Sequence, residues 1–285
     1  MVKHLIMDEA KKRTLTSLAK SFARKNDAGE DIEKPMWSAD FVLGKGTGLI
    51  FLLHGKPGVG KTLTAAAFTR RPLMILTASD IGTDPQDVEE ELSKHFRRAK
   101  NWGAVLLIDE ADVFMERRST ADLTRNSLVA GFLRALEYYE GILFLTTNRV
   151  GSFDDAFISR VHVQLYYPEF TDDQRHKVWQ TFIDKLELER KGYMRLSYAA
   201  KEFIRETKNN LKWNGREIRN AVSLAEYDAE KDEEGTILVT DHHLQAVVEL
   251  SKDFKDYLKE LHMADEAKRA EARVERLDSF RGETS

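Results

Sequence analysis

The sequence predicts an α/β fold in which helices cover both faces of a parallel β-sheet, followed by a smaller all-α domain. Five short runs are apolar without polar alternation, as expected for strands buried on both faces of a parallel sheet. These runs lie at residues 49–53, 73–76, 104–108, 142–146 and 161–165. Helical patterns separate them, which is typical of an α/β protein. After Pro168 only helical patterns follow, and this change predicts the second domain.

The predicted elements divide the chain into four segments. Residues 1–39 form a charged, helix-like segment, and residues 40–168 form the α/β core with further helices expected at 87–100 and 124–139. Residues 169–250 are expected to form helices at 171–187, 197–209, 215–231 and 241–261. Residues 251–285 form a charged tail with a thin apolar seam, for which a solvated helix or a frayed tail is favoured over a short coiled-coil contact. The seam consists of Ala267, Ala270, Val274 and Leu277.

The composition describes a globular protein and excludes several kinds of function. The 285 residues carry a formal net charge of −4, so no overall attraction to nucleic acid or anionic lipid is expected. Cysteine is absent, which excludes disulfides, thiolate metal sites and thiol catalysis. The N-terminus resembles neither a secretory nor a transit signal, and the apolar runs are too short to be a membrane segment. An intracellular, soluble protein is expected, with cytoplasm and nucleus not distinguished.

Residues 55–62, GKPGVGKT, match the phosphate-loop pattern G-x-x-x-x-G-K-[ST] and follow the first apolar run. Glycines let consecutive backbone N–H groups turn toward phosphate oxygens, and the next helix directs its positive N-terminus at the same anion. Lys61 is expected to reach the β- and γ-phosphates, and the Thr62 hydroxyl to ligate Mg²⁺. A chance match in a glycine-rich turn is the plainer alternative. The predicted nucleotide-binding residues are Gly55, Lys56, Pro57, Gly58, Val59, Gly60, Lys61, Thr62 and Leu63.

Two acids follow the third apolar run, and an amide follows the fourth. Ligands of open parallel sheets bind beyond the carboxyl ends of the strands, where these side chains emerge. Asp109 is suited to hold Mg²⁺ through water, and Glu110 to take a proton from an attacking water. Asn148 is suited to orient that water or to contact the γ-phosphate. Without the phosphate loop, an acidic helix N-terminus would be sufficient to explain the two acids, and a strand-ending turn would be sufficient to explain Asn148.

The motifs GKPGVGKT, LLIDE, LTTN and the downstream AFISR together resemble those of the AAA+ ATPases. The match is most specific to the AAA-type ATPases of filamentous fungi, because several further stretches occur in order between about residues 40 and 250. These stretches are GLIFLLHG, DEADVFMERRS, EYYEGI, TTNRVGSFDDAF and NGREIRNAV.

The resemblance implies a five-stranded P-loop NTPase sheet of order 5-1-4-3-2, a small helical lid and a ring, usually a hexamer, with ATP between neighbouring copies. Arg160 would be the arginine finger that reaches the neighbour's γ-phosphate, since a guanidinium stabilises spread negative charge. A surface salt bridge is the plainer alternative for Arg160. Arg216 or Arg219 would be the second sensor, and Arg216 is preferred because it follows Gly215.

Three features depart from the family pattern. Lys56 stands where proline is usual, and the helix after Thr62 is a few residues shorter and must end before Pro72. Ile81 has no aromatic neighbour at the position where protein-threading members carry an aromatic pore residue. A grip on a polypeptide by aromatic side chains is therefore disfavoured, and an aliphatic grip is left open.

The sequence therefore predicts ATP binding and Mg²⁺-dependent hydrolysis of ATP by a homo-oligomer that remodels a protein or a protein complex, with the protein substrate unknown. Two alternatives remain open. One is a nucleotide-gated assembly module with weak turnover, and the other is a DNA-associated AAA+ ATPase. The net charge does not favour nucleic acid as the partner.

Overall fold

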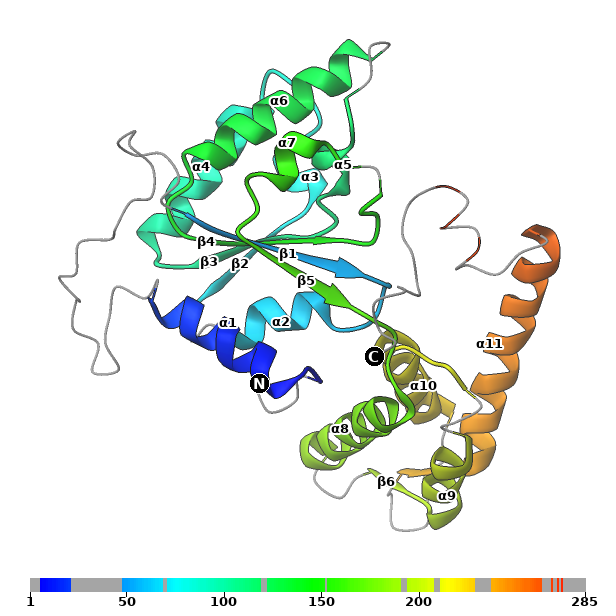
Figure 1. The fold of residues 1–285 in the computed structure, drawn as a ribbon. Helices are drawn as coiled ribbons and strands as arrows, with labels where there is room; N and C mark the ends of the chain where they lie inside the picture. Colours follow the sequence, from blue (N-terminus) through cyan, green and yellow to red (C-terminus); the bar gives the residue numbers. More distant parts are fainter. Residues whose placement is uncertain are drawn as a thin grey trace. The chain divides into compact units, whose positions relative to one another are not determined.

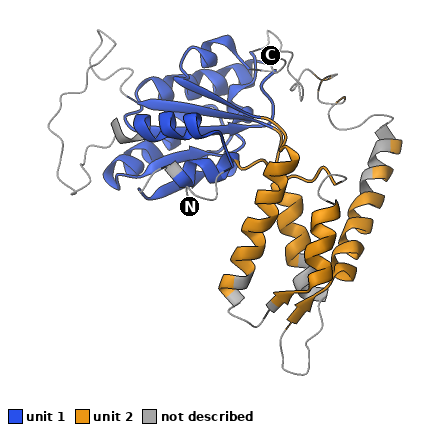
Figure 2. Cartoon of the chain, turned by 60° about the horizontal axis from the view of Figure 1, so that its bottom comes forward, with its two compact units in different colours: residues 1–55, 61–167, 274–276 blue, residues 56–60, 168–273, 277–285 orange. Residues whose placement is uncertain are grey.

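A computed structural model describes residues 6–21, 48–68, 71–118, 122–151, 153–190, 194–207, 211–228, 237–262, 268, 271 and 273. The chain divides into two compact units (Figure 2). The core unit comprises residues 1–55, 61–167 and 274–276, and the lid unit comprises residues 56–60, 168–273 and 277–285. Most of the phosphate loop, residues 56–60, thus groups with the lid unit although the flanking residues belong to the core unit.

The core unit is built on a five-stranded parallel sheet of order β2-β3-β4-β1-β5. This is the predicted order 5-1-4-3-2 read from the opposite edge, so the fold prediction is confirmed. The strands are β1 (Leu49–Gly55), β2 (Leu73–Leu76), β3 (Val105–Ile108), β4 (Ile142–Thr147) and β5 (Val163–Tyr167). Every residue of β3 and β4 is buried, as the continuous apolar runs require of strands covered on both faces.

Helices lie on both faces of the sheet (Figure 1). One face carries α1 (Glu9–Ser21) and α2 (Lys61–Phe68), and the other carries α4 (Val88–Asn101) and α6 (Leu123–Glu137). As expected from the sequence, α2 is short, with 8 residues. Three one-turn helices were not predicted, because four residues are too few to show a helical period. They are α3 (Ala78–Ile81), α5 (Asp112–Met115) and α7 (Asp155–Ile158).

The pore-loop position falls within α3. Ile81 is 1% exposed and belongs to the hydrophobic core of the core unit. A side chain that is packed this closely cannot grip another polypeptide without leaving the core. The aliphatic grip that the sequence left open is therefore not supported for Ile81.

The lid unit contains the four predicted helices, α8 (Asp172–Arg190), α9 (Tyr198–Thr207), α10 (Gly215–Asp228) and α11 (Asp241–His262). It also contains a short parallel pair, β6 (Met194–Leu196) with β7 (Ile237–Val239), so the lid is mainly rather than wholly helical. Strands of three residues show no period in the sequence, and their pairing joins segments far apart in the chain. Trp179 of α8 and Trp213, which lies two residues before α10, are both buried and stack on each other.

The predicted tail is only partly described. Residues 251–262 form the end of α11, whereas the seam residues Ala267, Ala270, Val274 and Leu277 lie outside the described residues. None of the helices in the described ranges is both long and apolar enough to span a membrane.

Candidate functional site

Lys61 and Asn148 meet at the carboxyl ends of the two neighbouring strands β1 and β4. Lys61, the first residue of α2, is 8% exposed. Its Nζ donates to the carbonyl oxygen of Gly55 at 2.9 Å and to Oδ1 of Asn148 at 2.7 Å. A buried ammonium needs such polar partners. A fixed positive charge therefore lies beside the amide that the sequence predicts to orient the water or to contact the γ-phosphate.

Thr62 and Asp109 bring two oxygen-bearing groups together beside this pair. The Thr62 Oγ1 lies 3.4 Å and 3.5 Å from the two carboxylate oxygens of Asp109. These distances are long for a hydroxyl–carboxylate hydrogen bond, so the two groups are not locked to each other. A hydroxyl and a carboxylate are the hard oxygen ligands that Mg²⁺ prefers, usually with several waters retained. The donor set therefore fits the predicted magnesium ligands.

Thr146 holds both acids, and sequence reasoning missed it. Its hydroxyl, on buried β4, donates to Oδ1 of Asp109 and accepts a hydrogen bond from the backbone N–H of Glu110 at 3.2 Å. Thr146 is 2% exposed. A signal was present in the sequence, since a hydroxyl inside an otherwise apolar buried strand needs a polar partner.

Glu110 has an unusual backbone conformation. Its φ is +53°, and it is the one non-glycine residue with a positive φ in the described part of the chain. For an ordinary L-residue the left-handed region costs about 1–2 kcal/mol. Such strained residues cluster at active sites. The Glu110 side chain is exposed, which its predicted role as the base for an attacking water requires.

Residues 56–60 of the phosphate loop make their contacts within the lid unit. Lys56, the departure from the family pattern, forms an ion pair with Glu169. The carbonyl oxygen of Gly58 accepts a hydrogen bond from the N–H of Gly215 at 2.8 Å. Gly58 has a φ of +75°, and a Cβ there would lie 2.7 Å from Cγ of Asn214. Glycine is therefore required at position 58 by both conformation and space.

The other loop residues differ in exposure. Val59 is buried, Pro57 and Gly60 are half-buried, and Leu63 in the first turn of α2 is exposed. Gly55 ends β1 with a φ of +138°, and a Cβ there would collide with the carbonyl oxygen of Tyr167. The backbone at the start of the loop is therefore closely packed against β5.

The two candidates for the second sensor both lie on α10, which begins at Gly215. Asn214 caps this helix, because its Oδ1 accepts from the N–H groups of Arg216 at 2.9 Å and Glu217 at 3.0 Å. The Glu217 carboxylate accepts from the Asn214 N–H in return, at 2.7 Å, which completes a reciprocal capping arrangement. Arg216 and Arg219 are both exposed, and the Arg219 guanidinium contacts Asn220. The contacts do not separate the two arginines.

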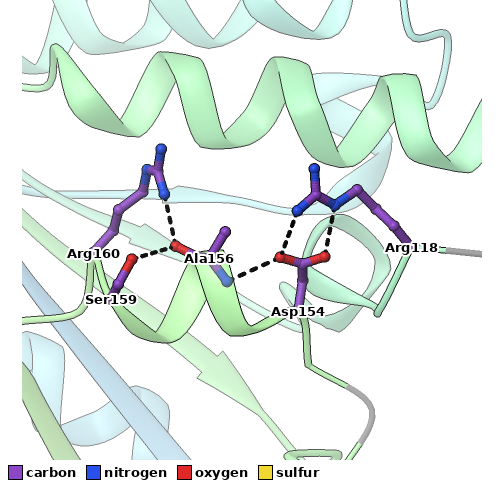
Figure 3. A network of polar contacts seen from close by, with 5 residues as sticks. All are labelled: Arg118, Asp154, Ala156, Ser159 and Arg160. Atoms are coloured by element: carbon purple, nitrogen blue, oxygen red, sulfur yellow. Dashed lines mark hydrogen bonds and ion pairs between the residues drawn. The ribbon is translucent and has the colours of Figure 1, made fainter.

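Arg160 is held elsewhere in the core unit. Its Nη1 donates to the carbonyl oxygen of Ala156 at 2.7 Å and its Nη2 to Oε1 of Glu137 at 2.5 Å (Figure 3 shows the Ala156 contact). No contact among the described residues joins its guanidinium to Lys61 or Asp109. The structure thus brings Lys61, Thr62, Asp109 and Asn148 together and leaves Arg160 apart from them.

His54 adds a neutral ring at the base of the loop. It lies in β1 beside Tyr166, with ring centroids 5.4 Å apart. Burial, and secondarily the charge of Lys61, lowers the pKa of His54 below its ordinary value. Because the ring stays neutral near pH 7, it adds no second positive charge beside Lys61.

Comparison with known families matches two consecutive regions of the chain. Residues 51–169 match the ATPase family associated with various cellular activities (AAA), and residues 170–265 match the fungal AAA+ ATPase lid domain. ATPase family AAA domain-containing protein 3B of Homo sapiens is 28% identical over 168 residues, which are 54% of this chain and 26% of that protein. ATPase family AAA domain-containing protein 3A of Homo sapiens is 26% identical over 203 residues, or 65% and 34%. ATPase family AAA domain-containing protein 3 of Bos taurus is 24% identical over 225 residues, or 73% and 38%.

The matched region spans between 26% and 38% of the length of these three relatives. A parallel sheet of this order, with a phosphate loop between its first strand and the next helix, defines the class of P-loop NTPases. Within that class, the chain belongs to the AAA+ ATPase family and carries the lid domain typical of fungal members.

Proposed function

We propose that this chain binds ATP together with Mg²⁺, hydrolyses it to ADP and phosphate, and uses the cycle to remodel a protein or a protein complex. The observation that carries the proposal is the paired arrangement of Lys61 with Asn148 and of Thr62 with Asp109 at the carboxyl edge of the sheet. A phosphate-binding lysine, a pair of cation ligands and an amide for the reacting phosphate are what phosphoryl transfer requires. The relatives are also named as ATPases.

In the proposed binding mode the triphosphate lies against the loop of residues 55–63. The backbone N–H groups of this loop and the N-terminus of α2 contact the phosphate oxygens. Lys61 neutralises charge on the β- and γ-phosphates. A further contact from the second sensor is proposed, with Arg216 preferred to Arg219 because Arg216 directly follows Gly215.

Thr62 and Asp109 would hold Mg²⁺, with Asp109 acting through water. The ion, when bound, neutralises negative charge on the phosphates. The chain's own contribution is to hold the two ligands in place, which Thr146 does for Asp109. The described residues contain no group of three His, Asp or Glu side chains that could hold a metal by themselves. The remaining ligands in this arrangement are phosphate oxygens and water, as is usual for Mg²⁺ with nucleotides.

Glu110 is the proposed general base. Its carboxylate takes a proton from a water molecule while the water oxygen bonds to the γ-phosphorus and the bond to the β–γ bridging oxygen breaks. Asn148 orients the water or the γ-phosphate from the end of β4. The strained backbone at position 110 supports this role, because strain of this kind is retained where the position of a side chain matters more than stability.

Arg160 is proposed to act on the ATP of a neighbouring copy in a ring, with six copies as the expected number. In its own chain the guanidinium contacts Glu137 and Ala156. An arginine needed in its own site would be expected near Lys61 instead. In a ring, the γ-phosphate of the neighbour would compete with Glu137 for the guanidinium, whose fixed charge stabilises the transition state.

The test is ATP turnover per subunit across protein concentration, with sizing in the presence and absence of ATP and Mg²⁺. Turnover per subunit should rise with concentration as copies associate. Lys61→Ala should lose ATP binding, whereas Glu110→Gln should bind ATP and release no phosphate. A monomer that turns over ATP at a rate independent of dilution would refute the shared site.

The short α2 favours one second candidate, a nucleotide-gated assembly module with weak turnover. An 8-residue helix packs less against the sheet than a longer one and supports the loop less firmly. Tight ATP binding with association but negligible turnover would favour this candidate. A DNA-associated ATPase would be favoured by turnover that DNA stimulates and that moderate salt abolishes.

A further inference from the structure

The segment that follows the two acids is joined to the segment that precedes Arg160. The N–H of Asp154 donates to the carbonyl oxygen of Met115 at 3.0 Å, and Glu116 forms an antiparallel bridge with Phe153. Arg118 then closes the contact, with Nε 2.7 Å from Oδ2 of Asp154 and Nη2 3.2 Å from Oδ1 (Figure 3). Three successive contacts therefore hold residues 115–118 against residues 153–154.

The Arg118–Asp154 pair differs from an ordinary surface salt bridge. Asp154 is 5% exposed, so its carboxylate depends on partners for its charge. The guanidinium of Arg118 lowers the pKa of Asp154 below its ordinary value, with a smaller contribution in the same direction from the N–H of Ala156. Two parallel hydrogen bonds also fix the carboxylate geometrically, which a single lysine contact would not do.

Asp154 in turn caps α7, the single turn that ends two residues before Arg160. The carboxylate accepts a hydrogen bond from the N–H of Ala156 at 3.0 Å. The carbonyl oxygen of the same Ala156 accepts from Nη1 of Arg160 and from the hydroxyl of Ser159 at 2.8 Å. Ala156 is therefore held by Asp154 through its N–H, and it orients the Arg160 guanidinium through its carbonyl oxygen (Figure 3).

We propose that Arg118 is a positioning residue for Arg160, acting through Asp154 and the single turn of α7. The inference rests on the proposed role of Arg160 in the neighbour's site. Arg118 follows Asp109 and Glu110 along the chain. The segment that begins with the acids of one ATP site therefore also contacts the residues that position Arg160, the arginine proposed to act in the neighbour's site. Loss of Arg118 should therefore impair the neighbour's site and leave the chain's own ATP binding intact.

The first measurement compares Arg118→Ala with Arg117→Ala, which removes the same charge one residue earlier from an exposed position. Because a misplacement of about 1 Å can cost about a hundredfold in rate, Arg118→Ala should lower turnover by roughly 10- to 100-fold. Its affinity for ATP should equal that of the unaltered chain, and Arg117→Ala should change neither quantity. Turnover equal in the two variants, or a parallel loss of ATP affinity in Arg118→Ala, would overturn the inference.

The second measurement mixes Arg118→Ala with Glu110→Gln, which has an intact Arg160 and cannot hydrolyse ATP. In a randomly mixed ring about a quarter of the sites would join a working base to a well-placed arginine, so turnover should rise well above that of either variant alone. Mixing Arg118→Ala with Arg160→Ala should produce no rise. A merely structural defect in Arg118→Ala would not be rescued by a partner copy.

Mixing Arg160→Ala with Glu110→Gln tests the shared site separately from the positioning role of Arg118. If turnover rose in this mixture but not in the mixture of Arg118→Ala with Glu110→Gln, the positioning role would be overturned and the shared site would stand. No rise in either mixture would reject the shared site, and the positioning role with it. Should Arg118→Ala fail to fold, Arg118→Lys carries the test, since it keeps the charge but not the paired hydrogen bonds. It is expected to lose turnover and to recover it on mixing.

Discussion

Replacement of Thr146 by valine tests how the two acids are held in place. The hydroxyl of this buried threonine donates to Asp109 and accepts from the N–H of Glu110. Valine has nearly the same shape but neither donates nor accepts, so the change removes both hydrogen bonds and leaves the packing of β4 in place. The carboxylate that is proposed to hold Mg²⁺ and the backbone of the proposed base then lose a shared anchor.

The magnitude follows from the two lost bonds. A hydrogen bond to a charged group contributes about 1.5–3 kcal/mol, and a donor left unsatisfied costs about 1–3 kcal/mol. Since the Glu110 N–H is only partly buried, a loss of about 2–4 kcal/mol in the free energy of unfolding is expected. Misorientation of the two acids should lower ATP turnover by roughly 10- to 100-fold, equivalent to about 1.4–2.8 kcal/mol in the barrier.

Two matched variants make the assay specific. Thr146→Ser keeps the hydroxyl and loses one methyl group, so its cost in stability should be about 1 kcal/mol, with turnover nearly unchanged. Thr147→Val removes a buried hydroxyl one residue further along β4, whose contacts are with Arg149 and Asp112 rather than with the two acids. Urea unfolding and phosphate release are measured for all three. If Thr146→Val turned over ATP as fast as Thr146→Ser, the anchoring role of the hydroxyl would be refuted.

Three further changes have defined outcomes. Gly58→Ala should unfold at a lower urea concentration and lose about 1–3 kcal/mol of unfolding free energy, because its Cβ collides with the asparagine that caps α10. Gly60→Ala is the control. Gly60 also has a positive φ, of +92°, but has open space around it, so this variant should lose less. Partial burial of the ring lowers the pKa of His162 below its ordinary value, and its Nδ1 accepts from the N–H of Ile50 at 3.1 Å. As the pH falls, the unfolded chain therefore takes up a proton at this histidine before the folded chain does. The contribution of neutral His162 to the free energy of unfolding is present above about pH 6.5 and is lost as the pH falls. His162→Asn should therefore show a smaller loss of unfolding free energy on acidification. Glu110→Asn should have a free energy of unfolding up to about 1 kcal/mol higher than Glu110→Gln, and a higher melting temperature, because asparagine tolerates the left-handed conformation better. Equal melting temperatures would contradict the inference that the backbone at position 110 is strained.

The sequence by itself determined the elements whose signals are local. The buried strands show as unbroken apolar runs, and each of the five runs lies within two residues of its strand. The phosphate loop is a contiguous motif, so Lys61 and Thr62 could be assigned without knowledge of the fold. Asp109 and Asn148 could be placed at the same sheet edge because parallel strands share the direction of their carboxyl ends.

Only the tertiary structure decided what depends on residues distant in the chain. The β6–β7 pair, the joint hold of Thr146 on the two acids and the ion pair of Lys56 with Glu169 each link segments that no local pattern connects. The same holds for Arg118, to which the sequence analysis gave no role and which the fold pairs with a buried carboxylate. Periodicity and motif spacing report on neighbours along the chain, whereas a hydrogen bond across the fold depends on the relative placement of whole elements, which packing determines.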